Sequence, residues 1–114
     1  MADGITIGNK TYKLDFSHRQ VRALCNLWKL NGNLTKYNNE LQNRLKGMEK
    51  NVTFKHIDTI VDIIYAAILG KDPQTKLTRD ALYDYLWNNQ DEMMQLIQEF
   101  ADSQAPKKKG KQQA

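Results

Sequence analysis

The sequence predicts a mainly α-helical fold, in which a short N-terminal β-hairpin precedes a compact bundle of four to five helices around a buried central helix. Three observations support this prediction. The segment "ITIGNKTYKL" alternates apolar and polar residues on both sides of a turn signal. Four later segments begin with residues that commonly cap helices. The segment "IDTIVDIIYAAILG", residues 57–70, is apolar around most of its circumference when it is drawn as a helix.

The length of 114 residues suits one domain, which we place at residues 1–103, followed by a lysine-rich tail at 104–114. The tail "QAPKKKGKQQA" has almost nothing apolar to bury and is predicted to be disordered. The start "MADGITIGNK" lacks the profile of a signal peptide, and a single cysteine excludes an internal disulfide. Acidic residues interrupt the apolar segment, so no membrane span is expected. A cytoplasmic location follows as the expectation.

The hairpin is predicted over about residues 4–15, with Gly8 and Asn9 at its turn. The flanking segments carry the side chains that strands favour: Ile5, Ile7, Tyr12 and Leu14. The next element is a helix that Ser17 is predicted to cap, with Gln20 completing a capping box. Its apolar residues recur at helical spacing: Val21, Leu24, Cys25 and Trp28.

Three later helices are predicted to begin after residues that are good caps: Thr53, Thr78 and Asn89. Glu92 stands at the capping-box position of the last of these helices. The core stripe of that helix is predicted to be Met93, Leu96, Ile97 and Phe100. Between the first helix and Thr53, residues 34–52 are polar and rich in asparagine, and they carry only a narrow apolar stripe: Tyr37, Leu41, Leu45 and Met48. A helix over this segment is expected to fray.

The helix that begins after Thr53 is predicted to be the buried axis of the fold. Its apolar residues cover most of the helix surface: Ile57, Ile60, Val61, Ile63, Ile64, Tyr65, Ala67, Ile68 and Leu69. The remaining strip consists of Asp58, Thr59, Asp62 and Ala66. We interpret the acids of this strip either as solvated or as partners for Arg and Lys elsewhere.

The charge of the chain is divided unevenly. The net charge is +4, and the four lysines of the tail account for all of it: Lys107, Lys108, Lys109 and Lys111. Up to His56 the chain has ten Lys and Arg against four acids, whereas residues 57–103 have three against nine, so the two halves carry +6 and −6. The halves are expected to pack together within one fold. Head-to-tail pairing of neighbouring subunits is the alternative hypothesis.

No set of residues predicts a reaction. His18 and Cys25 lie seven residues apart, which suits a Cys-His pair, but no third group orients them, and a small buried thiol is the simpler interpretation of Cys25. His56, Asp58 and Asp62 suggest a metal site, yet His56 and Asp58 point about 200° apart on a helix. The sequence has no Gly-rich phosphate loop, zinc spacing or Ser-His-Asp set. We therefore predict no enzyme, no cofactor and no metal.

Surface contact is the remaining way for this chain to act. Tyr83 and Trp87 project about 100° away from the apolar face of their helix, and Met94 is similarly displaced from the core stripe that follows. Aromatic residues and Met are enriched in protein interfaces. Tyr83, Trp87 and Met94 are therefore the candidate partner-binding residues, with ordinary packing under other helices as the alternative.

Three segments resemble a known family. They are "ITIGNKTYKLDFSHRQVRALC", "HIDTIVDIIYAAIL" and "LTRDALYDYLWNNQDEMMQLIQEF", and in this order and spacing they resemble the tail assembly chaperones of long-tailed phages that infect Gram-positive hosts. The resemblance covers roughly residues 4–103 and is weaker at 38–51. It implies a chaperone that binds and solubilises the tape measure protein in the host cytoplasm and is absent from the mature virion. It also implies that several copies bind each client, and homo-oligomers of the protein are possible.

The lysines of the tail allow three interpretations. They are a solvating extension, a weak and non-specific nucleic-acid contact, or the trace of a recoding site. The third follows from the resemblance, because such chaperones often have a longer form made by programmed frameshifting, which would contact the major tail protein. The alternative function is a small regulatory or DNA-associated protein that uses His18, Arg19 and Arg22 with the tail.

Overall fold

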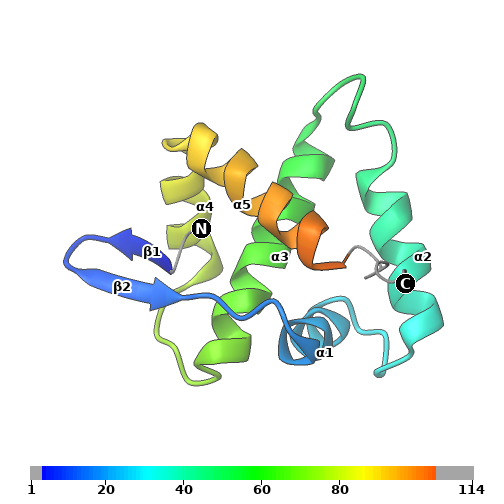
Figure 1. Ribbon diagram of the computed structural model, residues 1–114, viewed down its shortest axis with the longest axis horizontal. Helices are drawn as coiled ribbons and strands as arrows, with labels where there is room; N and C mark the ends of the chain where they lie inside the picture. Colours follow the sequence, from blue (N-terminus) through cyan, green and yellow to red (C-terminus); the bar gives the residue numbers. More distant parts are fainter. Residues whose placement is uncertain (1–3, 105–114) are drawn as a thin grey trace, which may run out of the picture.

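The computed structural model describes residues 4–104 and confirms the predicted fold class (Figure 1). Strands β1 (Gly4–Ile7) and β2 (Lys10–Lys13) form an antiparallel hairpin. Five helices follow within the described residues: α1 (His18–Leu27), α2 (Leu34–Leu45), α3 (Phe54–Lys71), α4 (Arg79–Trp87) and α5 (Gln90–Gln104). Helix α5 therefore includes Gln104, which was predicted to belong to the disordered tail, and residues 105–114 lie outside the described part of the chain.

The hairpin forms at the predicted turn. Ile5 pairs with Tyr12, and Gly8 in the turn has a φ of 67°, which a glycine adopts without strain. Ile5 is fully buried and anchors one face of the hairpin in the core. The backbone N–H of Asp15 donates to the carbonyl of Ala67 at 3.0 Å, so the segment after the hairpin is fixed to α3.

Helix α3 is the axis of the molecule, as predicted, and each of the other four helices packs against it (Figure 1). Its buried residues occupy most of its circumference: His56, Thr59, Ile60, Val61, Ile63, Ile64, Ala66, Ala67 and Ile68. Thr59 and Ala66 belong to the strip that was interpreted as solvated, yet both are fully buried. Other elements cover the strip: Asp62 pairs with Arg79, as the second interpretation expects, whereas the Asp58 carboxylate accepts a hydrogen bond from the hydroxyl of Tyr83.

The helix caps follow the sequence in part. Ser17, Thr53 and Thr78 cap α1, α3 and α4 as predicted, and Asn33 caps α2. The capping box predicted at Gln20 is wrong: its side chain is fully buried and donates to the carbonyl of Ile63 in α3. The predicted box at Glu92 also gives way to another contact, because this carboxylate accepts from the hydroxyl of Tyr85.

Helix α2 forms despite its polar composition, because one side of it packs on the rest of the fold. Tyr37 is buried and stacks on Trp28, with ring centroids 6.2 Å apart. Arg44 pairs with Glu40 at 2.7 Å, and its guanidinium lies 4.4 Å from the Trp28 ring centroid. Trp28 at the end of α1 therefore joins this helix to α2 through its contacts with Tyr37 and Arg44. Among the described residues no helix has the length and apolar content needed to cross a membrane.

Candidate partner-binding site

The three candidate contact residues lie in three different surroundings. Tyr83 is partly buried beside α3. Trp87 is 44% exposed at the end of α4, and Met94 is 42% exposed on α5. Trp87 and Met94 line different hollows, so the three residues do not form one continuous surface.

Tyr83 belongs to an internal polar network on the acidic strip of α3. Its hydroxyl donates to Oδ1 of Asp58 at 2.7 Å, and Nε of Arg79 donates to Oδ1 of Asp62 at 2.6 Å. The indole N–H of Trp28 donates to the other oxygen of Asp62 at 3.0 Å. Burial, followed by the hydrogen bond to Asp58, raises the pKa of Tyr83 to about 12. This network joins α1, α3 and α4. The hydroxyl of Tyr83 is therefore already used in a contact within the fold.

Met94 lines an apolar groove between α2 and α5. Leu41, Leu45 and Met48 form one wall, and the other wall comes from α5. The α5 residues that line the groove are Met94, Ile97, Gln98, Phe100, Ala101 and Gln104. The groove has a volume of about 430 Å³, and its walls are mostly apolar. Residues at such spacing present the ridge that a partner helix needs for close packing.

Trp87 stacks on Phe54, the first residue of α3. The two ring centroids are 5.7 Å apart and the ring planes are 16° from parallel. Phe54 is 66% exposed, so the stacked pair is an exposed aromatic patch. Trp87 also lines a hollow at the turn between α4 and α5 together with Asp91 and Glu92. The patch therefore combines an apolar surface with acids beside it.

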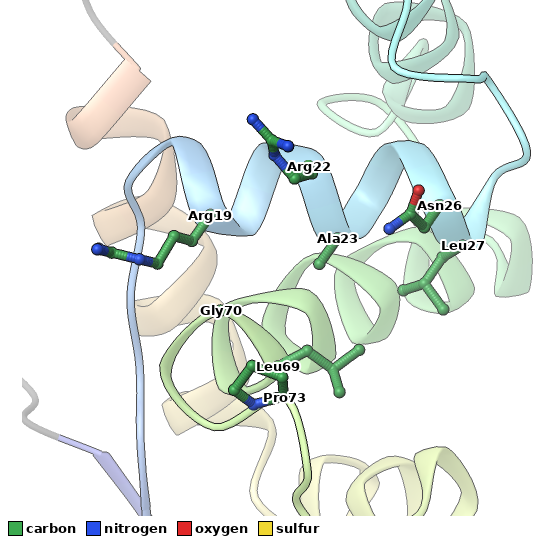
Figure 2. A pocket seen from close by; sticks show the side chains of 8 residues that line it. All are labelled: Arg19, Arg22, Ala23, Asn26, Leu27, Leu69, Gly70 and Pro73. Carbon is green, nitrogen blue, oxygen red and sulfur yellow. The ribbon is translucent and has the colours of Figure 1, made fainter.

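A cleft with a different character lies between α1 and the end of α3 (Figure 2). Ala23 and Leu27 stand on the α1 wall, and Leu69, Gly70 and Pro73 form the opposite wall. Arg19 and Arg22 of α1 also line this cleft, whose volume is about 450 Å³. Figure 2 shows the Arg19 side chain reaching past the end of the cleft and the Arg22 side chain pointing away from Leu69 and Pro73. An apolar interior with guanidinium groups at its edge suits a ligand that offers an apolar side chain next to a carboxylate.

Gly70 sets the distance between the two walls of this cleft. A Cβ at this position would lie 3.1 Å from the backbone nitrogen of Gln20 and 3.2 Å from Cβ of Arg19. A larger residue would therefore push α1 away from α3. The absence of a side chain at Gly70 allows the close approach that forms the cleft.

His18 and Cys25, considered above as a reactive pair, line one hollow beside the loop that follows α1. His18 is exposed, whereas Cys25 is 1% exposed. Burial raises the pKa of the Cys25 thiol, which disfavours the thiolate that a nucleophile requires. This arrangement agrees with the interpretation of Cys25 as a core residue.

His56 serves the cap of α3. The backbone N–H of Thr53 donates to its Nδ1 at 3.0 Å, so its Nε2 carries the proton and donates to the carbonyl of Lys46 at 2.8 Å. Both ring nitrogens are therefore used by the fold. Within residues 4–104 no group of three or more His, Cys, Asp or Glu side chains is placed to hold a metal ion.

Sequence reasoning missed Phe54 and the cleft between α1 and α3. Phe54 stands between the cap Thr53 and the apolar run of α3, and an aromatic residue outside the core periodicity is a signal that was available. The cleft had no such signal, because it depends on how closely Gly70 lets two distant helices approach. Lys107, Lys108, Lys109 and Lys111 lie outside the described residues.

Comparison with known proteins adds no relative. No protein-family model, curated protein or solved structure matches this chain.

Proposed function

We propose that this protein is a non-catalytic tail assembly chaperone that binds and solubilises the tape measure protein, a long helical client, during phage tail assembly. The groove between α2 and α5 is the observation that carries the proposal. It is mostly apolar and is lined by Met and Leu side chains, of which the flexible Met adapts to irregular partners. A client helix with apolar residues at i, i+3, i+4 and i+7 would fit such a groove.

The wall residues of the groove differ in what they contribute. Ile97 and Phe100 are 7% and 3% exposed and belong to the core, so they fix the floor. Met94 and Ala101 are exposed and stand seven residues apart on one side of α5. In the proposal these exposed positions touch the client, because they remain accessible in the folded protein.

Co-expression with a candidate tape measure protein tests the proposal. The wild-type chain is expected to move the client into the soluble fraction, and Met94→Glu is expected to weaken binding of a client fragment about tenfold or more, because a carboxylate would lose its water inside an apolar contact. Gln95→Glu is the matched control, since Gln95 is exposed on the same helix and does not line the groove. A client that stays insoluble with the wild-type chain, or equal effects of both variants, would refute the proposal.

A second candidate function has its own observation. His18, Arg22 and Asn26 are exposed at four-residue spacing on α1, and such a row of donors also suits nucleic acid. A gel-shift titration across salt separates the two cases. Binding that survives removal of residues 104–114 and is lost in Arg22→Glu would favour this second candidate, whereas binding lost with the tail alone would assign it to the lysines.

A further inference from the structure

The charge difference between the two halves of the chain persists in the folded molecule. The described ion pairs each join two residues of the same half: Arg19 with Asp15, Arg44 with Glu40, and Arg79 with Asp62. These pairs leave the net charges of +6 and −6 in place, because none of them takes one partner from each half. The exposed cations therefore come mostly from the first half of the chain, and the exposed acids mostly from the second half.

Two exposed features lie at the two ends of α3, one with acids beside it and the other lined by arginines. The aromatic patch of Phe54 and Trp87 lies at its first residue, and the cleft lined by Arg19 and Arg22 lies at Gly70. Sixteen helical residues separate Phe54 from Gly70, a distance of about 24 Å at 1.5 Å per residue. In Figure 1 the turn between α4 and α5 lies at the top of the view, and α1 with the end of α3 lies at the bottom. The two features face different sides of the molecule.

We propose that the α4–α5 corner of one copy, with Trp87 and its neighbouring acids, docks into the cleft between α1 and α3 of a second copy. The cleft offers an apolar interior for the indole ring, and arginine side chains at its edge stack on aromatic rings and pair with carboxylates. Asp84 stands three residues before Trp87 on the same helix, and Asp91 lines the hollow beside it. Both acids are exposed and would meet the arginines of the second copy.

The charges around the cleft favour this occupant over the protein's own tail. Lys71 follows Gly70 and adds a third cation, while two acids lie nearby: Asp15, which is paired with Arg19 at 3.5 Å, and the exposed Asp72, which stands directly before Pro73. A lysine-rich segment would meet like charge here, whereas an acidic corner meets opposite charge. Because the two contacting surfaces differ, the contact is head-to-tail, and a pair of copies keeps one free cleft on one copy and one free corner on the other. Repetition of the contact gives rows or rings of subunits.

Two double variants test the contact: one removes positive charge from the cleft, and the other removes negative charge from the corner. Arg19→Gln with Arg22→Glu disables the cleft, and Asp84→Lys with Asp91→Asn disables the corner. Each variant alone is expected to sediment as a monomer at protein concentrations up to about 1 mM, where the wild-type chain associates. An equal mixture of the two is expected to form one-to-one pairs, because the intact corner of the cleft variant fits the intact cleft of the corner variant. Circular dichroism confirms that each variant is folded.

Salt and a matched control complete the experiment. Association of the wild-type chain is expected to weaken at least about tenfold between 0.1 and 1 M NaCl, as the Debye length falls from about 10 to about 3 Å. Lys36→Glu reverses an exposed charge in the basic half, away from the cleft, and should leave association unchanged. A monomeric wild-type chain at both salt concentrations, a mixture that does not pair, or an equal loss in Lys36→Glu would overturn the proposal.

The result is separable from the test of the client groove. None of the substituted residues lines the groove between α2 and α5, so the variants retain that surface. Met94→Glu is expected to lose client binding and to keep the association between copies, because Met94 lines the groove and not the cleft. Failure of association likewise leaves the chaperone proposal standing on the groove.

Discussion

Substitutions of Gln20 test how α1 is held against α3, and thus how the cleft is built. The Gln20 side chain is fully buried, and its Nε2 donates to the carbonyl of Ile63 at 3.0 Å. Its Oε1 is buried and has no hydrogen-bond partner among residues 4–104. The side chain therefore makes one favourable contact and carries one unpaired polar atom into the core. Gln20→Leu and Gln20→Glu both remove the hydrogen bond, but the first also removes the unpaired polar atom, whereas the second adds a buried charge.

The structure gives the expected sign and size of each effect. Leucine forfeits a hydrogen bond that contributes about 0.5–1.5 kcal/mol and removes an unpaired acceptor that costs about 1–3 kcal/mol. The effect of Gln20→Leu on the free energy of unfolding is therefore expected to lie between a loss of about 0.5 kcal/mol and a gain of about 2.5 kcal/mol. Gln20→Glu replaces the donor with a buried carboxylate beside the Ile63 carbonyl, and an unpaired buried charge is expected to cost about 3–5 kcal/mol.

Urea unfolding followed by circular dichroism measures both variants. At pH 7 Gln20→Glu should be less stable than Gln20→Leu by at least about 3 kcal/mol. Burial raises the pKa of the introduced carboxyl above the value of about 4.3 that it has in the unfolded chain. The folded variant then binds the proton more readily, so its stability rises as the pH falls from the folded pKa towards about 4.3. A loss of more than about 2 kcal/mol in Gln20→Leu, or equal stability of the two variants at pH 7, would refute the reasoning.

Two further predictions concern the internal network and the partly buried Tyr83 and Tyr85. Asp62→Ala removes the acceptor of both the Trp28 indole N–H and the Arg79 guanidinium, so we expect the free energy of unfolding in urea to fall by about 2–4 kcal/mol. Asp62→Asn keeps an acceptor and should lose less, and equal losses in the two variants would count against the network. Burial, with a hydrogen bond to a carboxylate, raises the pKa of Tyr83 to about 12, and a hydrogen bond to a carboxylate, with burial, does the same for Tyr85. Their neutral forms are favoured in the folded protein, so this stability is complete below the unfolded tyrosine pKa of about 10 and is lost as the pH rises towards 12. Ultraviolet titration of Tyr83→Phe and Tyr85→Phe checks this, and ionisation of either residue near pH 10 would contradict it.

The elements that depend on local pattern were predictable from the sequence. Helix α3 carries apolar residues around most of its circumference, and packing at the centre of a helical bundle removes them from water. The cap residues Ser17, Thr53 and Thr78 mark helix starts because their side chains satisfy backbone N–H groups within three residues. These signals need no knowledge of the remaining fold.

The contacts that depend on distant residues were not predictable in the same way. Gln20 has the spacing of a capping box, but a buried carbonyl 43 residues further along the chain accepts its hydrogen bond instead. Tyr83 and Trp87 project from α4 at similar angles from its apolar face, yet they meet different neighbours. The hydroxyl of Tyr83 donates to Asp58 of α3, whereas Trp87 stacks on Phe54 and remains 44% exposed. A helical projection gives the direction of a side chain, and only the tertiary fold decides what meets it.

The two proposals depend on separate parts of one axis. The groove between α2 and α5 runs beside α3, whereas the cleft and the aromatic corner lie at its two ends. A head-to-tail row built through the ends would leave the groove of every subunit free. A client helix longer than one subunit would then be held by several grooves at once, and each groove would need only modest affinity, because linked contacts add through effective concentration. This relation explains why weak apolar contact on a small domain would be enough to keep a long helical client in solution.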